Sequence, residues 1–130
     1  MKIALAADHG GFQMKEALKA HLIERGIEIL DLGTDSEASV PYPVYGKACG
    51  EAVASGQADR GILVCGTGIG ISIAANKVKG IRAAVVNNEF GAEMTRRHNH
   101  ANILCMGGRV LGAGAALEIV DTFLHTGFEG

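Results

Sequence analysis

Apolar residues along the chain gather in five short and nearly continuous runs that are rich in Ile, Val, Leu and Ala. Runs of this length without polar alternation are typical of strands buried on both faces of a parallel sheet. The pattern therefore predicts five buried strands. Their ranges are Lys2–Ala7, Ile27–Leu32, Gly61–Cys65, Ile81–Asn87 and Asn102–Met106.

Between these runs, hydrophobic residues recur at the three- and four-residue spacing of helices. The predicted helices are Phe12–Arg25, Val44–Ser55, Ile71–Lys77, Phe90–His98 and Ala113 to about His125. Strands and helices thus alternate along the whole chain. This order favours an α/β domain with a five-stranded parallel sheet, right-handed crossovers and helices on both faces. We expect residues 1–130 to form a single domain.

Glycine is abundant, with 19 among 130 residues, and many glycines follow the ends of predicted strands. They form Gly10–Gly11 after the first strand, Gly66, Gly68 and Gly70 after the third, and Gly107–Gly108 after the fifth. In open parallel sheets, ligands bind beyond the carboxyl ends of the strands, where neighbouring crossovers leave in opposite directions. If the first strand lies beside the third, as in the flavodoxin-like order, these turns face one crevice. That crevice is the predicted ligand site.

The segment CGTGIGIS, residues 65–72, follows the third strand and opens a helix. Successive backbone N–H groups of such a turn, together with the helix dipole, can cradle an anion. The segment lacks the Lys-Ser/Thr ending of a P-loop and differs from the GxGxxG fingerprint, so glycines that merely permit a tight turn are the alternative. Cys65 stands directly before the cradle, near a helix N-terminus that stabilises a thiolate, and this favours a reactive site.

Further candidates stand at the ends of other predicted elements. Asp8 and His9 follow the first strand: Asp8 is either a helix N-cap or a binding residue, and His9 is suited to donate to an anionic or hydroxylated ligand. Arg109 follows the fifth strand at the same edge of the sheet, where a ligand charge is its natural partner. His98 and His100, at the end of the fourth helix, are either capping residues or functional ones.

Composition excludes several classes of protein. With 12 basic and 14 acidic residues, the net charge of −2 offers no footprint for nucleic acid or an anionic membrane. The apolar start MKIALAA is too short for a signal peptide or a membrane span, so we expect a cytoplasmic protein. The three cysteines form no CxxC pair, which encodes neither a disulfide framework nor a zinc ribbon, and we expect Cys49 and Cys105 to be buried thiols.

Three functions can be built from these parts. A Cys/His hydrolase would use the glycine turn as an oxyanion hole. A sugar isomerase would use the thiolate to move a proton between adjacent carbons, with the N–H cradle stabilising an enediolate. A non-catalytic module would use the cradle to bind a nucleotide or another phosphate. The residue types alone do not choose among the three.

A resemblance favours the isomerase. The segments ADHGGFQMKEAL, CGTGIGISIAANK and RRHNHANILCMGGRV, with their spacing, resemble the ribose-5-phosphate isomerase B family, which also contains galactose-6-phosphate and allose-6-phosphate isomerases. The likeness covers nearly the whole chain. It implies a Rossmann-like α/β/α domain and an aldose–ketose isomerase of a sugar phosphate, foremost ribose 5-phosphate, without metal or organic cofactor. It also implies a homodimer, often paired into a tetramer, whose active sites are shared between two subunits.

The resemblance also assigns roles by position. Cys65 matches the base that moves the proton between C2 and C1, His98 matches the group that opens the sugar ring, and Thr67 assists ring opening. Substrate binding falls to Asp8 for the hydroxyls, His9 for the phosphate, Gly66, Gly68, Ile69 and Gly70 for the reacting end, and Asn99 and Arg109 from the partner subunit. Some members carry a glutamate base where this chain has Ile71, so the chain belongs with the cysteine-base branch.

The chain departs from the family pattern in two places. The family usually has Asp-Tyr-Pro where this chain reads Pro41-Tyr42-Pro43, so Tyr42 either covers a pocket or plugs the surface. Members commonly continue past the final Glu-Gly with a tail whose two arginines help bind phosphate, whereas this sequence ends at Gly130. We expect either that Arg109 and His9 carry the anion or that the substrate is another sugar: a tetrose, a hexose or an unphosphorylated sugar.

Overall fold

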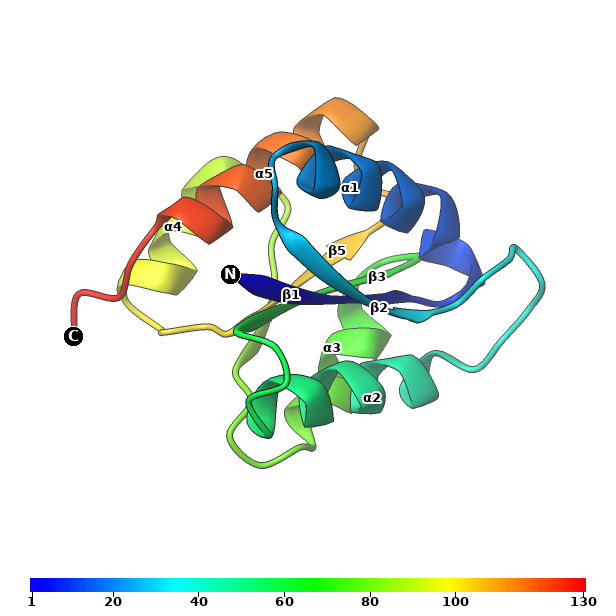
Figure 1. The fold of residues 1–130 in the computed structure, drawn as a ribbon, viewed down its shortest axis with the longest axis horizontal. Helices are drawn as coiled ribbons and strands as arrows, with labels where there is room; N and C mark the ends of the chain where they lie inside the picture. Colours follow the sequence, from blue (N-terminus) through cyan, green and yellow to red (C-terminus); the bar gives the residue numbers. More distant parts are fainter.

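The computed structural model describes residues 1–130 as one sheet of five parallel strands with helices on both faces (Figure 1). The strands are β1 (Lys2–Ala7), β2 (Glu28–Gly33), β3 (Arg60–Cys65), β4 (Ala83–Val85) and β5 (Ile103–Gly107). The helices are α1 (Phe12–Glu24), α2 (Tyr42–Ala54), α3 (Ile69–Asn76), α4 (Glu89–Arg97) and α5 (Ala113–His125), with a short 3₁₀ turn η1 (His9–Gly11) before α1. The predicted α/β/α fold with a five-stranded parallel sheet is confirmed.

The strand order across the sheet is β2-β1-β3-β5-β4. β1 therefore pairs with β3, with Ala7 opposite Val64 near the ends of the two strands. From this pair the chain crosses to β2 on one side and to β5 and β4 on the other, so the loops that follow β1 and β3 diverge. The predicted flavodoxin-like order is correct, and it places the turns after β1 and β3 next to each other.

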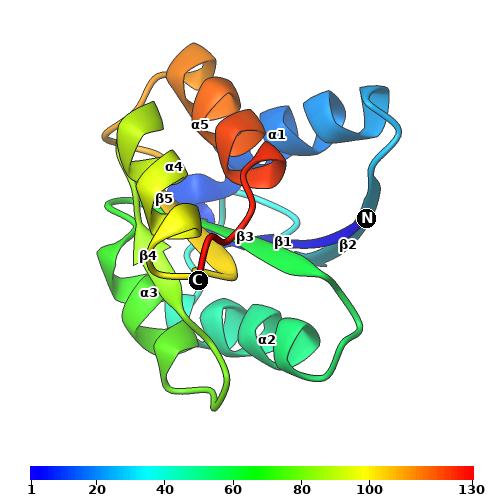
Figure 2. The ribbon, with the colours of Figure 1, turned by 90° about the vertical axis from the view of Figure 1, so that its left-hand side faces the viewer.

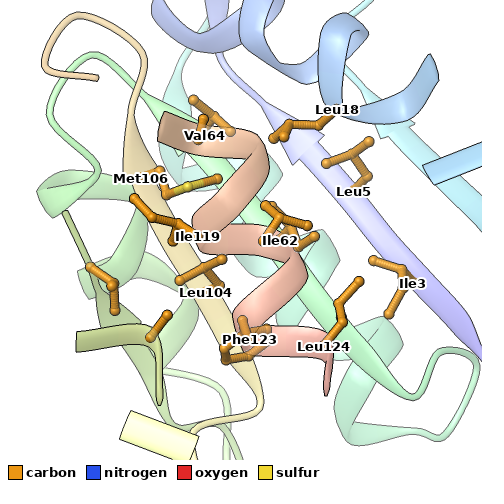
Figure 3. Close-up of a cluster of buried hydrophobic side chains, with 14 of the residues drawn as sticks. Ile3, Leu5, Leu18, Ile62, Val64, Leu104, Met106, Ile119, Phe123 and Leu124 are labelled. Atoms are coloured by element: carbon orange, nitrogen blue, oxygen red, sulfur yellow. The ribbon is translucent and has the colours of Figure 1, made fainter. Parts of the chain in front are cut away.

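Two layers of helices cover the sheet (Figure 2). The side chains of Ile3 and Leu5 face a buried cluster with α1, α4 and α5, part of which is drawn in Figure 3, whereas Ala4 and Ala6 face a second cluster with α2 and α3. Successive residues of a strand point to opposite faces, so both clusters draw on the same strands. None of the helices has the length and hydropathy that a membrane-spanning segment needs.

The prediction that every strand is buried on both faces is right for β1, β3 and β5 and wrong for the two edge strands. β2 and β4 are largely half-exposed, because an edge strand has a neighbour on one side only. β4 is also shorter than predicted. Its pairing register with β5 covers only Ala83–Val85; before it the N–H of Arg82 donates to the side chain of Asn102, and after it Asn88 caps α4 by accepting from the N–H of Gly91.

Candidate active site

Three strand-to-helix turns meet at the carboxyl edge of the sheet. Gly10, after β1, lies so close to the turn after β3 that a Cβ atom on it would be 3.0 Å from the nitrogen of Gly66. Gly108, after β5, is even closer to the first turn, because its Cβ would be 2.7 Å from the carbonyl oxygen of Gly10. Backbone therefore packs on backbone here, and the predicted meeting of the glycine turns is confirmed.

Cys65 is the last residue of β3 and is 5% exposed. Its Sγ accepts a hydrogen bond from the backbone N–H of Gly68 over 3.1 Å. Gly68 has φ of 82°, a left-handed conformation that glycine adopts without strain, and it directly precedes α3. An N–H donor and a helix N-terminus both favour a negative charge on this sulfur.

The rest of the cradle lies at the surface. Thr67 is exposed, and its Oγ1 accepts from the backbone N–H of Ile69 over 3.2 Å, while Ile69 is 55% exposed. The ring of Tyr42 lies on Gly70, where a Cβ would be 2.9 Å from the ring. Tyr42 also lines an apolar cavity of about 210 Å³ between α2 and α3. Tyr42 thus covers the first turn of α3.

The other two cysteines differ from Cys65. Cys49 and Cys105 are fully buried. Burial raises the pKa of Cys49 to about 12 and raises that of Cys105 well above its ordinary value. Both stay neutral thiols near pH 7, which confirms the prediction made for them. No group of three or more His, Cys, Asp or Glu side chains in residues 1–130 is arranged to hold a metal ion.

A polar pocket of about 220 Å³ adjoins the cradle and is lined by His9 and Arg109, among others. The guanidinium of Arg109 also reaches the turn after β3, since a Cβ on Gly66 would be 3.4 Å from its Nη1. Asp8 is 7% exposed, and its Oδ1 accepts from the N–H of Gly10 over 2.9 Å. The capping role considered for Asp8 is therefore present, and it shapes the turn that carries His9.

The sequence analysis missed two residues that line this pocket, Gln13 and Glu37, and a third, Val40, that contacts its His9. The Gln13 amide donates to the Glu37 carboxylate over 2.7 Å, and both side chains line the pocket. The backbone N–H of Val40 donates to Nδ1 of His9 over 3.1 Å. Glu37 and Val40 belong to the β2–α2 loop, which has no hydrophobic period. The loop could have been identified from its position directly after β2, because that strand also ends at the carboxyl edge of the sheet.

His98 and Asn99 lie at the opposite, amino edge of the sheet. α4 ends at Arg97, and a helix between parallel strands runs back to their amino ends, as its yellow end in Figure 1 shows. Six residues of β3 span roughly 20 Å at strand rise, which separates this edge from Cys65. His98 and Asn99 are exposed. One chain alone does not bring these two residues to Cys65.

The surroundings of His100 carry positive charge. Arg82 Nε donates to the carbonyl oxygen of His100 over 2.8 Å, so this arginine stabilises the turn after α4. Loss of hydration, and then the charges of Arg82 and Arg96, lower the pKa of His100. The immediate surroundings of His100 are therefore cationic, and His98, two residues earlier in the chain, is exposed.

Comparisons with known proteins agree with one another. The sequence profile described as Ribose/Galactose Isomerase matches residues 3–130. Ribose-5-phosphate isomerase B of Escherichia coli (strain K12) is 50% identical over 129 residues, 99% of this chain and 87% of the relative. The 4-deoxy-4-sulfo-D-erythrose isomerase of Clostridium sp. (strain MSTE9) is 41% identical, over 98% of this chain and 81% of the relative. The solved Clostridium thermocellum ribose-5-phosphate isomerase B has a TM-score of 0.99 at 55% identity, covering 100% of this chain and 88% of that one.

Proposed function

This chain belongs to the ribose/galactose isomerase family, and we propose that it interconverts ribose 5-phosphate and ribulose 5-phosphate with Cys65 as the base. Because the chain belongs to this family, it is a sugar-phosphate aldose–ketose isomerase. The particular sugar and the catalytic base are the parts that we propose. The observation that carries the assignment of the base is the hydrogen bond from the Gly68 N–H to Cys65 Sγ at the start of α3. We further propose that residues 1–130 act as a single catalytic domain.

The reaction moves one proton between two carbons. In the open-chain aldose, the Cys65 thiolate takes the proton from C2, the released electron pair forms the C1–C2 double bond, and negative charge moves onto O1. Backbone N–H groups at the start of α3 stabilise this enediolate. The Cys65 thiol then returns its proton to C1, while the proton on O2 passes to O1. The products are a C2 carbonyl and a C1 hydroxymethyl group, so atoms and charge balance.

Sugar phosphates exist largely as rings, so a second group must open the ring before Cys65 acts. We assign this step to His98, assisted by the Thr67 hydroxyl, and a substrate contact to Asn99. Because His98 and Asn99 lie exposed at the amino edge, they reach a crevice only from a second copy of the chain. We therefore propose a homodimer with shared sites.

The remaining polar groups bind the rest of the substrate. Asp8 would contact the hydroxyls, and His9 and Arg109 the phosphate. The place of Arg109 beside Gly66 supports a contact within its own chain, unlike the partner contact that the resemblance implied. The turn from Gly66 to Gly70 holds the reacting end.

Ribose 5-phosphate is the first choice because relatives with that name are 50% and 55% identical. The relative that is 41% identical and named for a four-carbon sugar makes a tetrose the second candidate. The test is an isomerase assay of ribose, allose, galactose and tetrose phosphates, each beside its unphosphorylated sugar. We expect the largest kcat/KM with ribose 5-phosphate and incorporation of solvent deuterium at C1 or C2. A larger value for a tetrose phosphate would reassign the substrate, and nucleotide binding without any isomerisation would refute the proposed activity.

A further inference from the structure

The loop between β2 and α2, residues 34–41, supplies one side chain that lines the polar pocket and one N–H that contacts His9, and the reaction described above uses neither. The backbone N–H of Val40 donates to Nδ1 of His9, and the Glu37 side chain lines the pocket together with Arg109. The inference drawn from them rests on the proposed function, because the pocket is the one assigned to the phosphate end of the substrate.

The loop is tied to the elements that carry Asp8 and His9. Thr34 is 5% exposed, and its N–H donates to the last carbonyl of β1 over 2.8 Å. Just before it, the Asp31 carboxylate accepts from the N–H of Gly33 and from the ammonium groups of Lys15 and Lys19, each over 2.9 Å. Burial opposes ionisation of Asp31, but these hydrogen bonds outweigh it and lower the pKa of the carboxyl. The base of the loop is therefore fixed.

The contact from Val40 decides the state of the His9 ring. An imidazole nitrogen that accepts a hydrogen bond carries no proton, so the proton of the neutral ring is on Nε2. Protonation of Nδ1 would set two donors, its own N–H and that of Val40, against each other. His9 is then a neutral side chain whose available donor is Nε2–H.

The charges that line the pocket come from Arg109 and Glu37. With His9 neutral, these two charges cancel. Glu37 is held by its hydrogen bond with Gln13, so its carboxylate opposes an incoming dianion from a defined position. A pocket of this kind recognises its ligand through hydrogen bonds more than through net charge.

We propose that the loop of residues 34–41 determines the specificity of this pocket. Val40 holds His9 as a neutral Nε2–H donor, and Glu37 lowers the affinity for a doubly charged group. A pocket with Arg109 and without Glu37 would favour a phosphate dianion more strongly. In this pocket, sugar ends that carry a hydroxyl or a single negative charge therefore compete more effectively with the dianion.

The first test reads the tautomer of His9 directly. Long-range ¹H–¹⁵N correlation NMR on ¹⁵N-histidine-labelled protein separates the two neutral tautomers and the cation, and a His9→Gln variant assigns the signals. We expect the Nε2–H form of His9 at pH 8. An Nδ1–H form or a cation would overturn the proposal. The spectrum does not depend on turnover, so this result is independent of the proposed function.

The second test measures the effect of Glu37 on phosphate. The Glu37→Gln variant should bind inorganic phosphate about 3- to 10-fold more tightly in calorimetry at pH 8 and low salt. The matched control is Glu24→Gln, which removes an exposed carboxylate at the end of α1 and should leave the affinity unchanged. Equal affinities of the Glu37→Gln variant and the wild type would overturn the assignment to Glu37. If the wild type showed no isomerase activity, the proposed function would be refuted, but the phosphate affinities would still test the role of Glu37.

Discussion

The two edges of the sheet are completed by different parts of the chain. At the amino edge, side chains bind the backbone: Asn102 accepts from the N–H of Arg82 and donates to the carbonyl of Gly80, and Asn76 bonds both backbone groups of Ala83. At the carboxyl edge, glycine turns pack on one another by their backbones, and the N–H of Gly68 at the start of α3 donates to Cys65 Sγ. The amino edge therefore mainly stabilises the fold, whereas the carboxyl edge carries most of the groups that we propose to act on the substrate.

His98 is the exception to this division, because it is a proposed reaction group at the structural edge. In the proposed mechanism, His98 reaches Cys65 only if two chains associate so that the amino edge of one chain lies near the carboxyl edge of the other. The contrast between the edges is therefore also a prediction about assembly.

The largest effect is expected from removal of the sulfur at the carboxyl edge. Cys65→Ala should lower kcat by about 10³-fold, because proton transfer by a positioned base contributes about 10²- to 10⁴-fold. Cys49→Ala is the matched control, since it removes a buried neutral thiol and should leave kcat within a few-fold. Steady-state kinetics on folded protein checks both. Full activity of Cys65→Ala would remove it as the base.

The next effect tests whether the edges of two chains meet. His98→Asn should reduce turnover of the ring form by about 10²-fold and affect an open-chain analogue less. If each site joins Cys65 of one chain with His98 of another, subunit exchange between Cys65→Ala and His98→Asn proteins creates hybrids with one intact site. About a quarter of wild-type activity should then return. Absence of recovery, with exchange verified by native mass spectrometry, would contradict a shared site.

A smaller effect distinguishes a glycine of the edge from a glycine of a helix. Gly108→Ala should lower the free energy of unfolding by about 1–3 kcal/mol, because its Cβ would meet the Gly10 carbonyl oxygen at 2.7 Å. Gly114, in the first turn of α5, has nothing within 4 Å of a Cβ, so Gly114→Ala should raise that free energy by about 0.5–1 kcal/mol. Urea unfolding measures both. If both variants changed the free energy of unfolding by the same amount and in the same direction, the close packing of the turns would not be rigid.

The smallest effect concerns acid stability at the carboxyl edge. Because the folded-state pKa of Asp31 lies below its ordinary value, its contribution is present above the unfolded pKa of about 3.9 and is lost as pH falls through the folded value. Stability should decline below about pH 4, and Asp31→Asn should flatten that decline. Urea unfolding between pH 2.5 and 6 compares the slopes. Identical slopes would show that Lys15 and Lys19 do not stabilise the charged carboxylate.

Much of the fold could be predicted because its signals are local. Every predicted strand and helix boundary lies within two residues of the observed one, since apolar runs and helical spacing report on burial one element at a time. Cys65, His9 and Arg109 could be singled out because each lies at or just after the end of a strand, and parallel strands bring their carboxyl ends to one edge. The burial of β2 and β4 was overestimated because a local run does not show which strands lie at the edges.

The amino-acid order determined the element types, the glycine turns and the chemistry gathered at one edge, because each depends on neighbours a few residues away. The contacts around the polar pocket, and the distance between Cys65 and His98, depend on residues that are far apart in the sequence. Val40 meets His9 across 31 positions, and no period in the sequence encodes such a meeting. His98 is separated from Cys65 because α4 must run back along the sheet before β5 begins. The folded chain thus sets which groups share a site, and the role proposed for His98 requires a second copy.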